Sequence, residues 1–371
     1  MTVEALPIGG TAPGTVQTLT VRRFGQPGAR PKVYVQAGLH ADEPPGMLAA
    51  HHLIGLLQAQ ADAGRMVGEV VVVACANPIG LSQQVMGSLI GRFDLGDGIN
   101  FNRGYPALAD SVAQAVSDKL TGDPAGNTAL IRAALLQANA ASEAVTPAEH
   151  LKRMLLGLAL DADLVLDLHC ENEGAVHLYT LTPLADRVGP LTALLGAQAL
   201  LLASDSGGQP FDEACSRPWL DFQSRFPGHP IPLACCAVTV ELRGEADVSR
   251  ALATADAEAL LASIIFEGTI DEAAPALPPA RCRPTNLADV ELLFAPMSGV
   301  LVLHRAVGDS IAPGDLMAEV IDPASGTVSA LHARYAGVLF AHESSRVVSA
   351  GCSVAKIAGT DAGRSGCLLG A

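Results

Sequence analysis

Short runs rich in valine and leucine alternate with alanine- and leucine-rich stretches of helical length through about the first 270 residues. The runs lack the apolar-polar alternation of a half-exposed strand, so we expect them to be buried on both faces. Strands of this kind separated by helices are typical of a sheet covered on both sides. With 371 residues and 49% hydrophobic residues, the chain can build such a core. We predict an α/β fold with a mixed, mostly parallel sheet and helices on both faces. The strand-like runs are 33–38 (VYVQAG), 69–77 (EVVVVACAN), 163–169 (DLVLDLH) and 235–242 (CCAVTVEL), and the helical stretches are 46–60, 126–140, 147–160 and 250–266.

A proline-rich stretch, 271–285 (DEAAPALPPARCRPT), reads as a linker to a different kind of sequence. Beyond it, short β-branched runs are spaced by glycine and proline turns, and residues 295–321 are similar to residues 332–358. This internal repeat predicts a small all-β domain with two similar halves. We therefore divide the chain into a catalytic domain, 1–275, and a C-terminal β-domain, 276–371.

The turn spacing of the second domain resembles that of a biotinyl/lipoyl-type barrel. A carrier domain of that type needs a lysine at the hairpin tip between its halves, and residues 319–329 (EVIDPASGTVS) contain none. A structural role, or one of covering an active site, is the favoured interpretation.

Charge and composition exclude several classes of partner. The 23 Lys and Arg residues face 38 Asp and Glu residues, and the net charge of −15 opposes binding to nucleic acid or to an anionic membrane. No apolar segment reaches the roughly 18 residues that a membrane span needs, and the N-terminus does not resemble a signal peptide. The eight scattered cysteines show no CxxC spacing, which favours reduced thiols in the cytoplasm. We expect a small-molecule substrate, and the sequence leaves a homo-oligomer open.

A polar side chain lies at or next to the end of each of the four strand-like runs: His40, Asn77, His169 and Glu241. The carboxyl ends of strands in an open α/β sheet border the ligand crevice, so these groups are expected to converge there.

His40 and Glu43 stand about one turn apart as the chain leaves the first run, which allows both to reach one ion. Zinc sites in hydrolases commonly combine two histidines and a carboxylate and leave a fourth position for water, and His169 would complete such a set. The alternative is a loop histidine beside a carboxylate that is favoured at a helix start. The strand-ending His169 and Glu241 favour the metal site.

Glu241 lies among apolar neighbours and is a candidate general base, because burial without a partner raises a carboxyl pKa. Its alternative role is an ion pair with Arg243, which would share its face if the strand continued. Arg92, Asn102 and Arg103 lie in a glycine- and aspartate-rich loop, 91–106, and are candidates for anchoring a substrate carboxylate. Taken alone, each arginine is more often part of a surface ion pair.

Taken in order, these residues resemble the succinylglutamate desuccinylase/aspartoacylase family, which has the zinc carboxypeptidase fold. The resemblance covers residues 30–360 and includes the appended β-domain. It implies one Zn²⁺ per chain bound by His40, Glu43 and His169, with Glu241 as the general base. It also implies that Arg92 polarises the scissile carbonyl and that the pair Asn102 and Arg103 holds a substrate carboxylate. Arg243 is a further candidate for substrate selection.

Three further residues are weaker candidates for a role in the site. Asp167, two residues before His169, is a candidate for orienting that histidine, with a solvated aspartate as the alternative. Cys170 follows His169 directly, so the two side chains point to opposite faces of a strand and do not suit a nucleophile and its base. Tyr335, in a turn of the β-domain, either covers the crevice or packs within its turn.

The predicted function is a zinc-dependent amide hydrolase that removes an acyl group from an N-acyl amino acid or a similar small amide bearing a carboxylate. Two alternatives remain: a zinc carboxypeptidase acting on peptides, and a non-enzymatic binding module on the same fold. Histidine and carboxylate ligands also accept cobalt, nickel or manganese, so the sequence leaves the identity of the ion open.

Overall fold

The computed structural model describes residues 1–369, and within this range the largest sheet has nine strands in the order β1-β2-β4-β3-β7-β11-β9-β10-β12. Parallel pairing joins β4, β3, β7 and β11 at its centre, and β9, β10 and β12 at one edge. The prediction of a mixed, mostly parallel sheet is confirmed. The strands are β1 (Thr2–Pro7), β2 (Thr18–Phe24), β3 (Lys32–Ala37), β4 (Glu69–Val73), β7 (Leu164–Glu171), β9 (His177–Leu181), β10 (Ala199–Ala203), β11 (Cys236–Gly244) and β12 (Pro284–Asn286).

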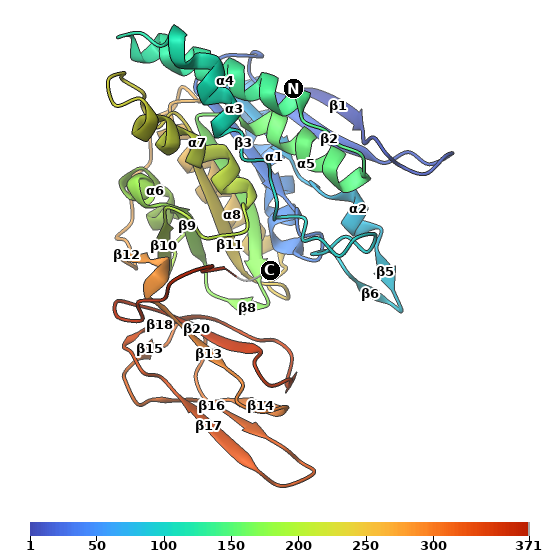
Figure 1. Cartoon of the computed structure of the whole chain (residues 1–371), viewed down its shortest axis with the longest axis vertical. Helices are drawn as coiled ribbons and strands as arrows, with labels where there is room; N and C mark the ends of the chain where they lie inside the picture. Colours follow the sequence, from blue (N-terminus) through green and yellow to red (C-terminus); the bar gives the residue numbers. More distant parts are fainter. Residues whose placement is uncertain (370–371) are drawn as a thin grey trace.

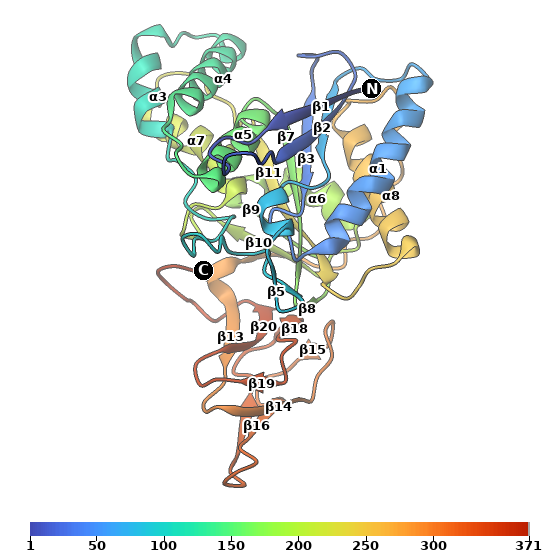
Figure 2. The same ribbon diagram turned by 90° about the vertical axis from the view of Figure 1, so that its right-hand side faces the viewer.

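Helices cover both faces of this sheet, as Figure 2 shows. Alternate residues of β3 enter different cores: Val33 and Val35 pack on the side of α1, α6 and α8, whereas Tyr34 packs on the side of α3, α4, α5 and α7. Burial on both faces explains why the strand sequences are apolar throughout. The helices are α1 (Pro44–Asp62), α3 (Ala109–Val116), α4 (Pro124–Ala141), α5 (Pro147–Ala159), α6 (Ala185–Leu194), α7 (Phe211–Arg225) and α8 (Arg250–Phe266).

Local signals in the sequence fix where several helices begin. Pro44 and Pro45 occupy the first turn of α1, where a missing N–H costs nothing. Thr146 and Glu149 form a capping box at the start of α5. Glu43 is the residue before α1, so the start of this helix fixes the position of its carboxylate.

A short helix and a hairpin follow β4 and lead into the loop that carries Arg92. They comprise α2 (Pro78–Leu81), β5 (Gln84–Val85) and β6 (Ser88–Leu89). The remaining short elements are β8 (Glu173–Gly174) and three 3-10 turns, η1 (Ser117–Lys119), η2 (Thr182–Leu184) and η3 (Leu287–Asp289). Among the described residues, no helix combines the length and the apolar character that crossing a bilayer requires.

The C-terminal part of the chain forms two further sheets, β13-β20-β18-β15 and β17-β16-β14-β19, around a core of its own. Each repeat lends a short strand to the sheet of the other, since β15 pairs with β18 and β19 pairs with β14. This exchange gives the two similar halves a common core. The strands are β13 (Val290–Phe294), β14 (Gly299–Leu303), β15 (Ser310–Ile311), β16 (Leu316–Ile321), β17 (Val328–His332), β18 (Gly337–His342), β19 (Val347–Val348) and β20 (Ser353–Gly359).

Residues 271–281 are exposed and form no helix or strand, as expected of a linker. The large sheet nevertheless gains its last strand, β12, after this segment, because β12 pairs with β10. A division of the chain near residue 275 therefore stays a proposal. The β-domain lies below the large sheet in Figure 1.

Candidate metal centre and the cavity around it

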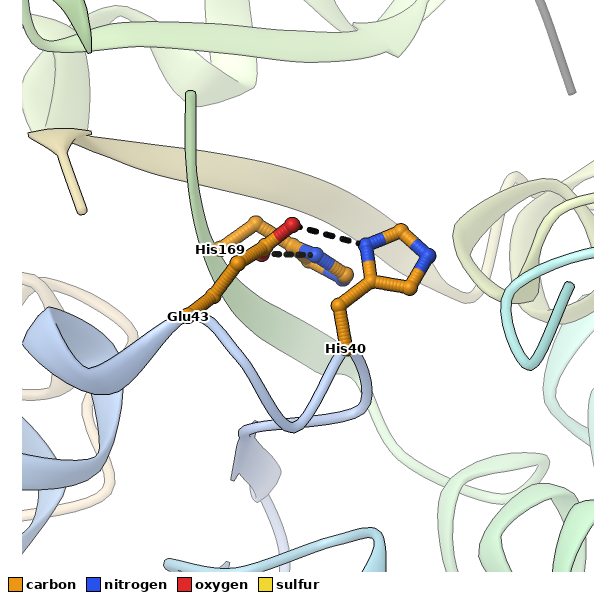
Figure 3. A group of neighbouring side chains, drawn as sticks. All are labelled: His40, Glu43 and His169. Carbon is orange, nitrogen blue, oxygen red and sulfur yellow. Dashed lines mark hydrogen bonds and ion pairs between the residues drawn. The ribbon is translucent and has the colours of Figure 1, made fainter. Parts of the chain in front are cut away.

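Three buried side chains from two segments meet at the carboxyl end of the central strands. His40 follows β3, Glu43 precedes α1, and His169 lies near the end of β7. Their ligand atoms all lie within 4.8 Å of one another. Glu43 stands between the two rings: its Oε1 is 2.8 Å from His40 Nδ1 and its Oε2 is 2.8 Å from His169 Nδ1 (Figure 3). The same two ring nitrogens and one carboxylate can thus face a single ion.

The second nitrogen of each ring also has a neighbour, as metal-ligating histidines usually do. His40 Nε2 is 2.9 Å from Asn100 Oδ1, and His169 Nε2 is 3.0 Å from Asp167 Oδ2, at ion-pair distance but without the alignment of a hydrogen bond. Gln36, opposite Asp167 on β3, donates to Asp167 Oδ1 over 2.9 Å. Asp167 thus lies between His169 and the Gln36 amide, and its role in orienting His169 stays a proposal.

This donor set fits a divalent cation. Burial would raise the pKa of Glu43, but His40 and His169 outweigh it and hold the pKa well below its usual value. A buried carboxylate between two imidazoles, each oriented through its second nitrogen, is the arrangement found in hydrolytic zinc sites.

Arg92 and Glu241 lie beside this group. Arg92 Nη2 donates to Glu43 Oε1 over 2.9 Å. Glu241 is opposite His169 across the β7–β11 pair, and its Oε2 is buried without a hydrogen-bond partner among the described residues. Burial, followed by the charges of Glu171 and Glu43, raises the pKa of Glu241 to about 8. A carboxylate with this pKa suits proton transfer near neutral pH.

A cavity of about 550 Å³ opens from the metal centre, between the large sheet and the β-domain. His40, Arg92, His169 and Glu241 line it together with the predicted pair Asn102 and Arg103. The pair is held by the backbone around it. Asn102 Oδ1 accepts from the N–H of Phe211, at the start of α7, over 2.9 Å, and Arg103 donates to the carbonyl of Asn102 over 2.8 Å.

The structure does not bring Arg243 to the cavity. The register of β11 shifts between Glu241 and Gly244, and Arg243 has a positive φ of 68°. Its side chain consequently turns away from that of Glu241 and pairs with Asp256 on α8, with Nη1 3.1 Å from Oδ1. The expectation that both residues share one face fails because the strand does not continue regularly. We leave Arg243 out of the proposed site.

Two other residues with weak claims also have local roles. Tyr335 is not among the cavity-lining residues, and its N–H donates to Glu291 Oε2 over 3.1 Å within the β-domain. Cys170 donates its N–H to Glu43 Oε2 over 3.1 Å, and burial strongly raises the pKa of its thiol. A thiol with a raised pKa is a poor nucleophile.

Sequence reasoning missed Glu171 and Lys356, which both line the cavity. Lys356 Nζ, on β20, lies 2.5 Å from Glu171 Oε1. Burial would raise the pKa of Glu171, but the positive groups around it, Lys356 first and then His177 and Arg92, together outweigh burial and lower the pKa. The position of Glu171, two residues after His169 on one strand face, was a usable signal. No sequence pattern pairs it with Lys356.

The comparisons with known proteins agree with this geometry. Residues 29–265 match the family model described as succinylglutamate desuccinylase/aspartoacylase catalytic domain. A crystal structure of a family protein from Shewanella amazonensis SB2B is 27% identical, with 96% of this chain and 98% of that chain covered and a TM-score of 0.84. A second, from Shewanella frigidimarina NCIMB 400, is 25% identical over 97% of both chains, with the same TM-score.

A more distant structure shares the fold alone. The ectoine utilization protein EutE (DoeB) from Ruegeria pomeroyi is 19% identical over 97% of this chain and 95% of that chain, with a TM-score of 0.67. A search of curated proteins found no match.

Proposed function

Because this chain belongs to the succinylglutamate desuccinylase/aspartoacylase family, we propose that it is a zinc-dependent deacylase. Its substrate would be an N-acyl amino acid or a similar small amide that carries a carboxylate. The observation that carries this proposal is the group formed by His40, Glu43 and His169, which opens into a cavity that also holds the buried base candidate Glu241.

A divalent cation held by His40, Glu43 and His169 would polarise the amide carbonyl and lower the pKa of an attacking water. Glu241 would take the proton from that water and return it to the leaving amine. The raised pKa of Glu241 supports both transfers, because the group gains and loses a proton near neutral pH.

The two arginines of the site would have different roles in catalysis and substrate binding. The Arg92 guanidinium, close to the metal ligands, would stabilise negative charge on the carbonyl oxygen. Arg103 and Asn102 would hold the substrate carboxylate, because a guanidinium suits bidentate recognition. An amide that lacks a carboxylate should therefore be a poorer substrate.

Several observations support the finer parts of the proposal. Cavity walls supplied by the β-domain favour small substrates over peptides, so we place a carboxypeptidase second. The ligand set is complete, which argues against a non-enzymatic binding module.

All eight cysteines are unpaired, which supports a cytoplasmic location. Zinc is the ion we propose, and His and carboxylate ligands also accept cobalt, nickel or manganese.

The test combines metal analysis with activity. Inductively coupled plasma mass spectrometry of the purified protein should find about one zinc per chain. The same samples should hydrolyse members of an N-acyl amino acid panel that also contains short peptides and amides without a carboxylate. Glu241→Gln should keep the metal and lose about 10² to 10⁴-fold in rate, whereas Glu343→Gln, a change elsewhere in the cavity, should keep both. Failure to bind metal when zinc is supplied would refute the proposal, and cleavage of peptides alone would replace it with a carboxypeptidase.

A further inference from the structure

The β-domain contacts the segment that directly follows the metal ligand His169. Strand β8 pairs with β18, so the catalytic domain adds a short strand to a sheet of the β-domain. The side chain of Asn172 donates to Glu343 Oε1 over 3.0 Å, and the N–H of Ala175 donates to the carbonyl of Phe340 over 2.8 Å. The chain that leaves the metal centre is thus fixed by another domain.

Two ion pairs in this interface differ in where they lie. Glu173 pairs with Arg346 over 2.9 Å, and these side chains are 39% and 44% exposed. Glu171 pairs with Lys356 over 2.5 Å, and these side chains are 17% and 31% exposed. Only the second pair has both partners on the wall of the cavity. Lys356 is also the only lysine that follows Lys152 in the sequence.

Glu171 lies where a free carboxylate would interfere with the site. It is two residues after His169, and its charge acts on both Arg92 and Glu241. A partly buried carboxylate that loses its cation is costly and is drawn to the next cation within reach. In this cavity that cation is Arg92, or a metal ion held by the three ligands.

We propose that Lys356 is a positioning residue of the site: its ammonium holds the Glu171 carboxylate against the cavity wall, away from Arg92 and the metal centre. The inference deepens the proposed function and rests on it. It makes the β-domain part of the working site, because the cation that restrains Glu171 comes from β20. Lys356 acts through Glu171 and does not contact the substrate.

The experiment is a double-mutant cycle with a matched control. Lys356→Met removes the charge at similar volume, Lys356→Arg keeps it, and Glu171→Gln removes the group that it restrains. Arg346→Met breaks the other interdomain ion pair and serves as the control. For each purified protein, kcat and KM on the best acyl amino acid, zinc content and the midpoint of thermal unfolding are measured.

We expect Lys356→Met to lower kcat/KM by about tenfold, because truncating one partner of a partly buried ion pair leaves the other uncompensated. Lys356→Arg should stay within about threefold of the wild type, and adding Glu171→Gln to Lys356→Met should restore activity to the level of Glu171→Gln alone. Arg346→Met should change kcat/KM by less than about twofold, as exposed ion pairs contribute little. Zinc content should be unchanged in every variant.

Three results would overturn the inference. If Glu171→Gln does not rescue Lys356→Met and KM alone rises, Lys356 contacts the substrate directly. If Arg346→Met and Lys356→Met have equal effects on kcat/KM and on unfolding, the pair serves only domain docking. If Lys356→Met is as active as the wild type, the carboxylate needs no restraint.

A wild-type protein that hydrolyses nothing in the panel would refute the proposed function alone. Calorimetric binding of succinate, a simple dicarboxylate, then replaces activity as the measurement. Weaker binding by Lys356→Met that Glu171→Gln restores would support the inference, because a released Glu171 competes for the cations of the cavity. Equal affinities, or no binding by any of the proteins, would overturn it.

Discussion

The two walls of the cavity each present a histidine beside a carboxylate, and only one of them forms a candidate metal centre. On the wall of the large sheet, His169 meets Glu43, and both side chains are 2% exposed. On the wall of the β-domain, His342 lies 2.9 Å from Glu173 of strand β8, which does not line the cavity, is 39% exposed and also pairs with Arg346. The first carboxylate is shared with a second histidine and the other with a cation. Convergence of buried donors, and not the residue types alone, makes the candidate metal centre.

Replacing the histidine on each wall is the most direct way to break this comparison. If the proposed site is right, His169→Ala should lose the metal and reduce activity by about 10³-fold or more, because one of the three proposed protein ligands is gone. His342→Ala should keep about one zinc per chain. The metal content and the hydrolysis rate of both variants test this expectation. Equal metal loss in the two would show that the β-domain wall also supplies a ligand.

Two neighbouring carboxylates, Glu171 and Glu241, have pKa values shifted in opposite directions, so the dependence of activity on pH tests their roles. The pKa of Glu171 is lowered because Lys356 and the other positive groups around it together outweigh its burial, whereas burial and nearby carboxylates raise the pKa of Glu241 to about 8. A base works only when deprotonated, so kcat/KM should fall about tenfold per pH unit below the pKa of Glu241. A bound cation lowers this pKa, so the acid limb is expected between about pH 5 and pH 8.

A pH profile of kcat/KM from pH 4 to pH 9 measures this limb. Glu241→Gln should remove the limb along with most of the activity, and Glu171→Gln should shift it to lower pH, because the charge of Glu171 raises the pKa of Glu241. A limb at pH 4 that is the same in wild type and Glu171→Gln would mean that another group is the base.

The wall of the large sheet could be predicted from sequence because its geometry follows from local rules. Polar residues that end buried parallel strands must meet at one edge of the sheet, and this rule predicts that His40, His169 and Glu241 converge. The helix start at Pro44 similarly fixes Glu43. The prediction for Arg243 failed because β11 is irregular: its register shifts after Glu241, and the Arg243 side chain pairs with Asp256.

The wall of the β-domain could not be predicted in the same way. Lys356 and Glu171 are 185 residues apart in sequence, and they meet only because β18 pairs with β8 and places β20 beside the end of β7. No composition or spacing pattern encodes how two folded domains dock. The internal repeat predicted that a second all-β unit exists, but not which of its side chains reach the cavity.

A smaller effect tests how the ligand histidine is held. Asp167→Asn leaves the ligands in place but removes the charge beside His169 Nε2. Changes of this kind typically weaken metal binding by about 10 to 100-fold. Competition with a zinc chelator measures the affinity. Glu173→Gln, the matching change beside His342, should leave it unchanged, and an equal loss in both variants would contradict the contrast between the two walls.

The smallest expected effect concerns the contact between the large sheet and the β-domain. His177 is fully buried on β9, and its ring lies 4.7 Å from that of Phe340 in the β-domain. Burial lowers the pKa of His177 to about 4, whereas an unfolded histidine titrates near 6.5. Between these values the unfolded chain binds more protons, so the free energy of unfolding falls as the pH falls through this range, by about 2 kcal/mol from pH 7 to pH 5.

Chemical denaturation at a series of pH values measures this loss. In His177→Gln, which cannot be protonated, the loss of stability from pH 7 to pH 5 should be smaller by about this amount, so the slope of stability against pH should flatten. The exposed His332→Gln should keep the slope of the wild type. His177 lies on a strand of the large sheet and contacts the β-domain. A flattened slope would therefore mean that protonation of this buried ring at low pH weakens the contact between the two parts. An unchanged slope in His177→Gln would assign the acid sensitivity to the carboxylates on the wall of the large sheet instead.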